Sequence, residues 1–249
     1  MGAPFRDITL YSPTETRVGT DAYKQERALL NYVSDLYIQY MRGYKPPNTT
    51  RVTIEPSYYG IWKQTWKIGS LKLIATYFNY QDFLALSKKG KYLYTLDVIH
   101  KSMLELSDEY EWDRAVFENA YAEMIKNDFV FRIEYPSKMS RDRRKAGGIV
   151  IEKSDLETTL FVNLITDTAQ KTVKLFHKKN WWRYDKAYSM AKAGKWFDNN
   201  RFGIEDKYSK WKVWYDLMTH KVAFEKEDVL LQENSPELNH LFLLHEMNQ

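Results

Sequence analysis

Residues 92–135 read YLYTLDVIHKSMLELSDEYEWDRAVFENAYAEMIKNDFVFRIEY, and the period of the apolar residues changes within this stretch. Two apolar stripes with spacings of three and four come first; their members are Leu93, Leu96, Ile99, Met103 and Leu106, then Val116, Phe117, Ala120, Tyr121 and Met124. Such stripes are typical of amphipathic helices, and the short polar break between them predicts an antiparallel pair. From Phe129 to Tyr135 every second residue is apolar or aromatic, which predicts a half-buried strand.

Residues on the N-terminal side of this stretch predict one long helix and a hairpin. Thr20 and Asp21 are good capping residues for a helix that extends to about Arg42. A strand is expected over residues 51–55. A hairpin is expected from residues 61–67 and 71–78, with its turn at residues 68–70.

Residues on the C-terminal side predict mainly strands. The strand that ends at Tyr135 is expected to pair with residues 149–153 across a long loop. The further expected elements are a hairpin of 160–164 with 173–175, a short helix at 181–197, a hairpin of 211–215 with 221–224, and a last helix that starts at Ser235. We therefore predict an α+β fold, with an antiparallel sheet built from hairpins and helices packed on one face.

Length and composition limit the class of protein. The chain has 249 residues, of which 44% are hydrophobic and 16% aromatic, too apolar for a disordered chain. We expect a single α+β domain over residues 1–249, with a soft division near residue 127 between a helix-rich and a strand-rich half. There is no cysteine, no long apolar segment and no apolar stretch typical of a secretory signal. We expect a cytoplasmic protein without membrane contact.

Catalytic motifs are absent from the sequence. It contains no P-loop, no G-x-G-x-x-G, no G-x-S-x-G and no H-E-x-x-H. His100 follows Asp97 by three residues, so the two side chains could meet on a helix surface as an acid–base pair. The alternative is a histidine at the edge of the apolar stripe, which we favour because no motif places a nucleophile nearby. We expect no enzyme activity.

Acidic residues crowd the turn between the two middle helices. They are Glu105, Asp108, Glu109, Glu111 and Asp113. Such a cluster could hold a divalent cation, but a metal loop usually has a glycine and a regular alternation of ligands, and both are missing. We expect a solvated turn, and no metal or other cofactor.

Positive charge is concentrated in two segments. Residues 136–148 carry Lys138, Arg141, Arg143, Arg144 and Lys145 against Asp142. Residues 171–195 carry eight basic residues against one acid, Asp185. Together these segments hold a charge of +11, whereas the whole chain has a net charge of +4, so the remainder carries −7. The sequence is therefore polarised rather than evenly basic.

A nucleic-acid-binding protein would explain this polarity. A basic hairpin tip after a helix resembles the wing of a winged-helix module, with residues 112–126 as recognition helix and residues 141–145 at the phosphates. Trp181, Trp182 and Arg183 could stack on unpaired bases. The acids in the expected recognition helix, Asp113, Glu118 and Glu123, argue against it.

A mobile, soluble hairpin tip is an equally good interpretation of the basic loop, and recognition of a protein is a third interpretation. Trp and Arg are residue types that contribute much of the binding energy at interfaces. Trp214 falls on the same strand face as Lys212, opposite Trp211 and Val213. A large aromatic there is either covered by a helix or offered to a partner, and the aromatic-rich composition favours the covered state.

The middle of the chain also resembles a family. The residues that carry the resemblance are Tyr94, Leu96, Asp97, Ile99, His100, Trp112, Asp113, Phe117, Glu118, Ala120, Tyr121 and Arg141-Asp142-Arg143. They resemble bacterial helix-then-sheet proteins associated with the immunity partners of polymorphic toxins, over about a third of the chain. The resemblance implies a small cytoplasmic protein that inactivates a specific toxin by covering its active site, and it assigns no binding residue.

These observations favour a protein that acts by binding. Our leading hypothesis is a non-catalytic, immunity-type inhibitor whose basic segments meet an acidic partner surface, since opposite potentials speed encounter. Its expected contact residues are Lys138, Arg141, Arg143, Arg144, Lys145, Trp181, Trp182, Arg183, Lys212 and Trp214. The alternative is a nucleic-acid-binding protein that uses the same basic residues.

Overall fold

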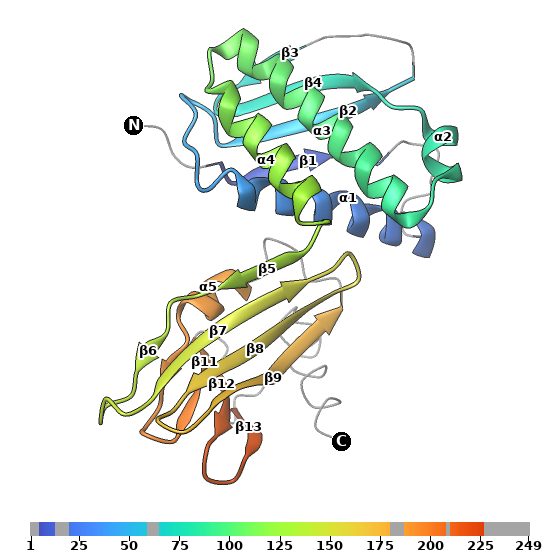
Figure 1. Cartoon of the computed structure of the whole chain (residues 1–249). Coiled ribbons are helices and arrows are strands. Elements are labelled where there is room, and N and C mark those ends of the chain that lie inside the picture. The colour runs from blue at the N-terminus through green and yellow to red at the C-terminus, as the bar shows by residue number, and fades with distance from the viewer. Residues whose placement is uncertain (1–4, 13–19, 59–64, 180–186, 208–209, 227–249) are drawn as a thin grey trace. The chain divides into compact units, whose positions relative to one another are not determined.

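The structure, a computed structural model, describes residues 5–12, 20–58, 65–179, 187–207 and 210–226 (Figure 1). The chain separates into two compact units, an N-terminal unit of residues 1–130 and a C-terminal unit of residues 131–249. The boundary lies three residues after position 127, where the sequence changes from helical to strand periodicity. Helices and strands are both abundant, so the predicted α+β class is confirmed.

The N-terminal unit contains a four-stranded sheet and the longest helices. Its elements in chain order are β1 (Asp7–Leu10), α1 (Asp21–Tyr40), β2 (Arg51–Ser57), β3 (Thr65–Ile68), β4 (Leu71–Tyr77), α2 (Tyr80–Ala85), α3 (Lys88–Tyr110) and α4 (Arg114–Lys126). The helix predicted from Thr20 is confirmed, and the Thr20 hydroxyl accepts a hydrogen bond from the backbone N–H of Tyr23. The predicted antiparallel hairpin is confirmed as β3–β4 for the described residues, with Gly69 at a positive φ of 58° in its turn. Residues 61–64 of its predicted first strand lie outside the described residues.

Strand pairing in this sheet differs from the prediction of a sheet made of antiparallel hairpins. The strand order is β1-β2-β4-β3, and β1 pairs parallel with β2, which pairs parallel with β4. β1 was not predicted, because a parallel partner is reached through a crossover helix, here α1, and leaves no turn signal. Among its described strands the sheet is therefore mixed, and only the β3–β4 pair is a hairpin.

Helices α1, α3 and α4 pack together beside this sheet (Figure 1). The face towards α3 is fixed by side-chain contacts: Thr76 of β4 hydrogen-bonds Ser102 of α3 at 2.7 Å. On the same face the buried ammonium of Lys72 lies 3.4 Å from the ring centroid of Tyr110. Among the described residues no helix has the length and apolarity needed to cross a membrane.

The C-terminal unit is built mainly from antiparallel strands. Its elements are β5 (Phe131–Glu134), β6 (Lys138–Met139), β7 (Ala146–Lys153), β8 (Glu157–Ile165), β9 (Gln170–Lys179), α5 (Ala187–Lys192), β10 (Lys195–Trp196), β11 (Arg201–Asp206), β12 (Trp211–Asp216) and β13 (Lys221–Lys226). One sheet has the order β5-β7-β8-β9, with β6 also paired to β7, and the other has the order β10-β11-β12-β13. The antiparallel prediction is confirmed for both.

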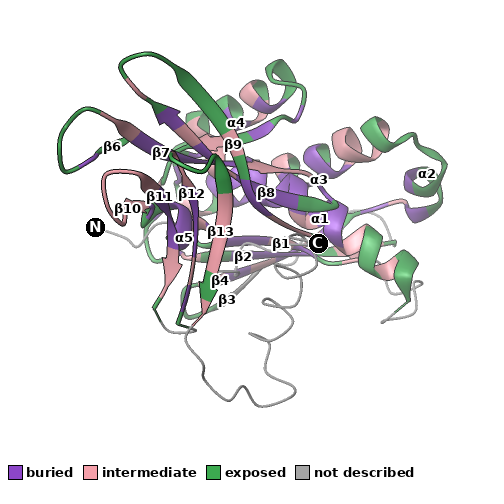
Figure 2. Ribbon diagram, turned by 90° about the horizontal axis from the view of Figure 1, so that it is seen from below, coloured by how far each residue is buried: buried purple, intermediate pink, exposed green. Residues whose placement is uncertain are grey.

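The two sheets of this unit pack face to face around a common core. Phe176 of β9 meets Trp211 of β12 at a ring distance of 6.5 Å, and a Cβ on Gly147 would lie 2.6 Å from Phe202. From Leu160 to Leu164, buried residues of β8 alternate with partly exposed ones, and Figure 2 colours much of this strand as buried. The core therefore lies between the two sheets, in a sandwich that also buries one side of α5.

Several predicted strands of this unit are confirmed, and one predicted helix is too long. β5 pairs with β7 as expected, and the 211–215 and 221–224 strands form the β12–β13 hairpin. The helix expected over 181–197 ends at Lys192, because Gly194 follows and the chain enters β10. The helix expected from Ser235 lies outside the described residues.

Candidate functional site: the turn end of the C-terminal unit

Four turns meet at one end of the sandwich, and we call this surface the turn end. It comprises residues 140–145, 166–169, 197–200 and 217–220. Strand register places the first two turns side by side at one end of their sheet, because Ala146 pairs with Ile165, which pairs with Gln170. In the other sheet it places the last two turns side by side, because Arg201 pairs with Asp216, which pairs with Lys221. Loops at one end of a sandwich commonly carry its binding function, since the sheets hold them in place.

The first turn, residues 140–145, is closed by its own hydrogen bonds. The Ser140 N–H donates to the Lys145 carbonyl at 2.8 Å, and the Lys145 N–H donates back to the Ser140 hydroxyl oxygen at 3.1 Å. The Ser140 hydroxyl donates to Asp142 Oδ1 at 2.6 Å, and the same oxygen accepts the N–H of Arg144. Ser140 is buried while Arg141, Arg143 and Arg144 are exposed, so a turn that is closed by its own hydrogen bonds presents three arginines.

A second set of contacts ties this turn to the other sheet. Lys145 Nζ donates to the Asn199 carbonyl and to Asn200 Oδ1, each at 2.8 Å. The N–H of Asp142 donates to Asn199 Oδ1 at 3.3 Å. We call this group, Lys145 with Asn199 and Asn200, the latch. The latch shows that Lys145, expected as a contact residue, is engaged within the protein.

Asp142 and Lys138 are also bound to other groups of the protein, whereas the side chains of the three arginines are not bound to any described residue. Hydrogen bonds from Ser140 and from the Arg144 N–H lower the pKa of Asp142, and the nearby charges of Lys145 and Arg144 act in the same direction. Lys138 Nζ donates to the Lys192 carbonyl at 3.2 Å, at the C-terminal end of α5. Within the described part of the chain, the side chains of Arg141, Arg143 and Arg144 have no ion pair or hydrogen bond. Of the five basic residues of segment 136–148 that were expected as contacts, these three are thus exposed and have no described partner within the protein.

The described basic residues of the second segment are spread over β9, α5 and β10. Four of its lysines lie along β9, an edge strand among the described residues; they are Lys171, Lys174, Lys178 and Lys179. Lys171 reaches the turn end, where its Nζ donates to the Tyr215 hydroxyl at 2.8 Å and that hydroxyl contacts His220 Nδ1 at 3.2 Å. Trp181, Trp182 and Arg183 lie outside the described residues.

Trp214 is covered, as the sequence analysis favoured, but by side chains rather than by a helix. It lies on the outer face of its sheet and is 8% exposed. The Arg201 guanidinium carbon lies 5.5 Å from a Trp214 ring centroid, and Phe197 meets the indole edge at 5.9 Å. Lys212 lies on the same face and pairs with Glu225 at 2.7 Å. Trp214 and Lys212 are therefore both engaged on the outer face of the sheet, and Lys212 lies towards the end of β12 that is away from the turn end.

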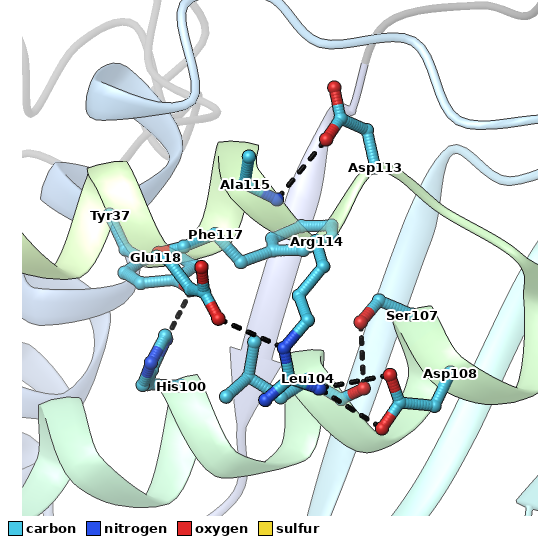
Figure 3. A network of polar contacts seen from close by, with 10 residues as sticks. All are labelled: Tyr37, His100, Leu104, Ser107, Asp108, Asp113, Arg114, Ala115, Phe117 and Glu118. Carbon is cyan, nitrogen blue, oxygen red and sulfur yellow. Dashed lines mark hydrogen bonds and ion pairs between the residues drawn. The ribbon is translucent and has the colours of Figure 1, made fainter.

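His100 and Asp97, the candidate acid–base pair of the sequence analysis, have separate partners in the N-terminal unit. His100 Nδ1 lies 3.0 Å from the Tyr37 hydroxyl (Figure 3), whereas Asp97 accepts the Tyr121 hydroxyl at 2.8 Å. The half-buried imidazole stacks on the Tyr121 ring at 4.4 Å. Burial lowers the pKa of His100, partly opposed by Glu118 and Asp97. The histidine thus joins the helices at the edge of the apolar stripe.

The acidic turn between α3 and α4 is likewise engaged in local structure. Asp113 caps α4 by accepting the N–H of Ala115 at 3.1 Å. Arg114 Nη1 donates to both oxygens of Asp108, and Arg114 Nε donates to Glu118 (Figure 3). Among the described residues, no group of three His, Asp or Glu side chains is arranged to hold a metal ion.

Sequence reasoning did not identify several residues of the turn end. Met218 is exposed in the turn end, Met139 and Ile165 are exposed directly beside it, and Arg201 Nε donates to Asp198 in its third turn. No local signal marks them, because strand register and the packing of the two sheets bring them together. The short β6 was missed for the same reason, since two residues are too few for a periodicity.

The chain was also compared with known proteins. No protein family, no curated protein and no solved structure matches it.

Proposed function

We propose that this protein is a non-catalytic protein-binding inhibitor of the immunity type, which acts in the cytoplasm and neutralises a partner protein by steric and electrostatic occlusion. The observation that carries the proposal is the turn of residues 140–145, which is held by its own hydrogen bonds and by the latch while it exposes three arginines. A rigid cationic turn loses little conformational entropy on binding and attracts an acidic surface.

The geometry supports binding rather than catalysis in a second way. The one candidate acid–base pair, His100 with Asp97, is divided between Tyr37 and Tyr121 within a helix layer. An inhibitor needs a preformed surface with arginine anchors, which the turn end offers.

A nucleic-acid-binding protein is the second candidate, because arginines bind phosphates as well as carboxylates. Its winged-helix form is not supported, since α4 belongs to the N-terminal unit and the 140–145 turn to the C-terminal sandwich. What favours the second candidate is the presence of three exposed arginines within four residues.

An affinity pull-down from the native host separates the two candidates. The lysate is divided into a nuclease-treated and an untreated half, and the eluates are analysed by mass spectrometry and nucleic-acid staining. One protein that co-elutes stoichiometrically from both halves, and stays bound in moderate salt, is the expected result. Nucleic acid in the untreated half, with an affinity whose logarithm falls by about 0.9 per phosphate contact for each log unit of salt, would support the alternative instead.

A matched pair of variants locates the surface. Arg143→Glu with Arg144→Glu reverses two charges at the turn end and is expected to abolish capture. Lys179→Glu with Lys207→Glu makes the same change in charge at the opposite end of the sandwich, where β9 and β11 end, and is expected to retain it. Loss of capture by both pairs would mean that net charge, rather than this turn, attracts the partner.

A further inference from the structure

An exposed apolar strip lies beside the three arginines. Met139 of β6 pairs with Ala146 of β7, and Ala146 pairs with Ile165 of β8. Side chains of directly paired residues project from the same face of a sheet. Met139 is 57% exposed and Ile165 is 43% exposed, while Ala146 between them is partly exposed. These three residues are the apolar strip.

The strip faces away from the core of the sandwich. Leu164, the neighbour of Ile165 in β8, belongs to the core between the sheets, and successive residues of a strand point to opposite faces. Three adjacent strands span about 10 Å, so the strip is about as wide as three residues of an extended chain are long.

The strip and the arginines are joined by chain continuity. The 140–145 turn leaves the sheet at Met139 and returns to it at Ala146, so its arginines begin where the strip ends. The hydrogen bonds of Ser140 and the latch of Lys145 fix both ends of this turn. An apolar surface and a cationic rim are therefore held side by side by the same hairpin.

We propose that the apolar strip and the 140–145 turn together bind an acidic segment of a partner protein, in which an apolar side chain lies among carboxylates. This inference rests on the proposed function and specifies the chemistry of the partner at the same surface. Arginine forms bidentate hydrogen bonds with carboxylates, and methionine adapts to apolar side chains of different shape. The strip has no aromatic ring, the group on which unpaired bases stack, so it suits a protein segment better than a nucleic acid.

Fluorescence anisotropy with three labelled probes tests the inference on the full chain. The probes are a peptide of alternating Glu and Leu, a peptide of equal charge that alternates Glu and Gly, and an oligothymidylate of equal charge. The Glu–Leu peptide is expected to bind about tenfold more tightly than the Glu–Gly peptide, because a buried leucine contributes about that factor.

Variants assign the effect to the strip. Met139→Ser with Ile165→Thr is expected to reduce affinity for the Glu–Leu peptide to that of the Glu–Gly peptide and to leave the latter unchanged. Leu156→Ser, at an equally exposed apolar residue in the β7–β8 turn at the opposite end, is the control and should have no effect. Arg141→Gln, Arg143→Gln and Arg144→Gln combined should abolish binding of both peptides.

Several results would overturn the inference. They are equal affinity for the two peptides, no detectable peptide binding, a preference that survives the strip variant, or tighter binding of the oligothymidylate. The inference and the proposed function fail separately. If a stoichiometric protein partner is captured and the strip variant captures it equally well, the inference fails alone. If the pull-down yields nucleic acid while the peptide preference holds, the proposed function fails alone.

Discussion

The two units use their charged side chains in different ways. In the N-terminal unit the acids around the α3–α4 turn bind to nearby groups: Asp113 caps a helix, and Asp108 and Glu118 both accept from Arg114. In the C-terminal unit the basic turn is held by Ser140 and by the latch, and its arginines point outward. Charge density in a sequence therefore does not by itself distinguish a structural role from a binding surface. What distinguishes them is whether each charged side chain is bound to another group of the same protein.

The largest expected effect concerns close packing in the C-terminal unit. A Cβ on Gly203 would lie 2.0 Å from the Val213 carbonyl oxygen and 2.6 Å from Trp214 Cα. Gly203→Ala is therefore expected to lower the free energy of unfolding by about 3 kcal/mol. Urea denaturation measures this effect. Gly90→Ala in α3 is the matched control in the N-terminal unit and should stay within about 1 kcal/mol, because alanine favours a helix; equal losses would contradict the contrast.

A smaller effect is expected from the cap of α4. Asp113→Ala removes the side-chain acceptor of the Ala115 N–H and should cost about 1 kcal/mol. Asp113→Asn keeps a capping oxygen and should restore most of this loss. Chemical denaturation followed by far-ultraviolet circular dichroism distinguishes the two variants. If both lose the same amount, the charge of Asp113 matters and its cap does not.

The latch should matter for local order as much as for stability. Lys145→Met removes two hydrogen bonds to Asn199 and Asn200 and is expected to cost about 1 kcal/mol. Amide hydrogen exchange within residues 140–145 should become faster. Arg144→Gln, which removes an outward charge of the same turn, should leave the exchange rates as they are; faster exchange in this control would show that the arginine also supports the turn.

The pH dependence of stability should report on His100 in the N-terminal unit. Because burial lowers the pKa of His100 below 6.5, the unfolded chain binds more protons in the window between the folded and unfolded values. The free energy of unfolding should therefore fall as the pH drops through that window. The contribution of His100 to stability should be fully present above pH 6.5. His100→Gln should flatten this part of the profile of denaturation midpoint against pH, and an unchanged slope would assign it to other groups.

The smallest effect on stability is expected where the effect on binding is largest. Replacing Arg141, Arg143 and Arg144 by glutamine should change the free energy of unfolding by no more than about 0.5 kcal/mol, because these side chains have no described partner to lose. Thermal unfolding measures the change. A larger loss would place these arginines among the structural charges and remove the contrast between the two units.

Local signals in the sequence were sufficient for much of the fold. The apolar stripes of α3 and α4, the Thr20 cap and the turn at Gly69 all act over a few residues, and all are present. The parallel pairing of β1 with β2 was not predictable in this way, because its partners lie more than forty residues apart.

Of the candidate site, the sequence revealed its charges but not their uses. Lys145 and Arg144 are adjacent and carry the same charge. Lys145 is bound in the latch, whereas the Arg144 side chain is exposed. Strand register makes this difference, as it does for Met139 and Ile165, which are 26 positions apart but share one strip. Such registers depend on the packing of two whole sheets.

The lysines along β9 have a consequence for how the protein behaves when it is concentrated. An edge strand with unpaired backbone groups is a template on which another chain can add, the first step of fibrous aggregation. Among the described strands β9 is such an edge, and it carries four lysines and a bulge opposite the Leu160–Phe161 step, so two such edges repel one another and fit poorly. The lysines of β9 are therefore expected to keep copies of the chain apart in concentrated solution.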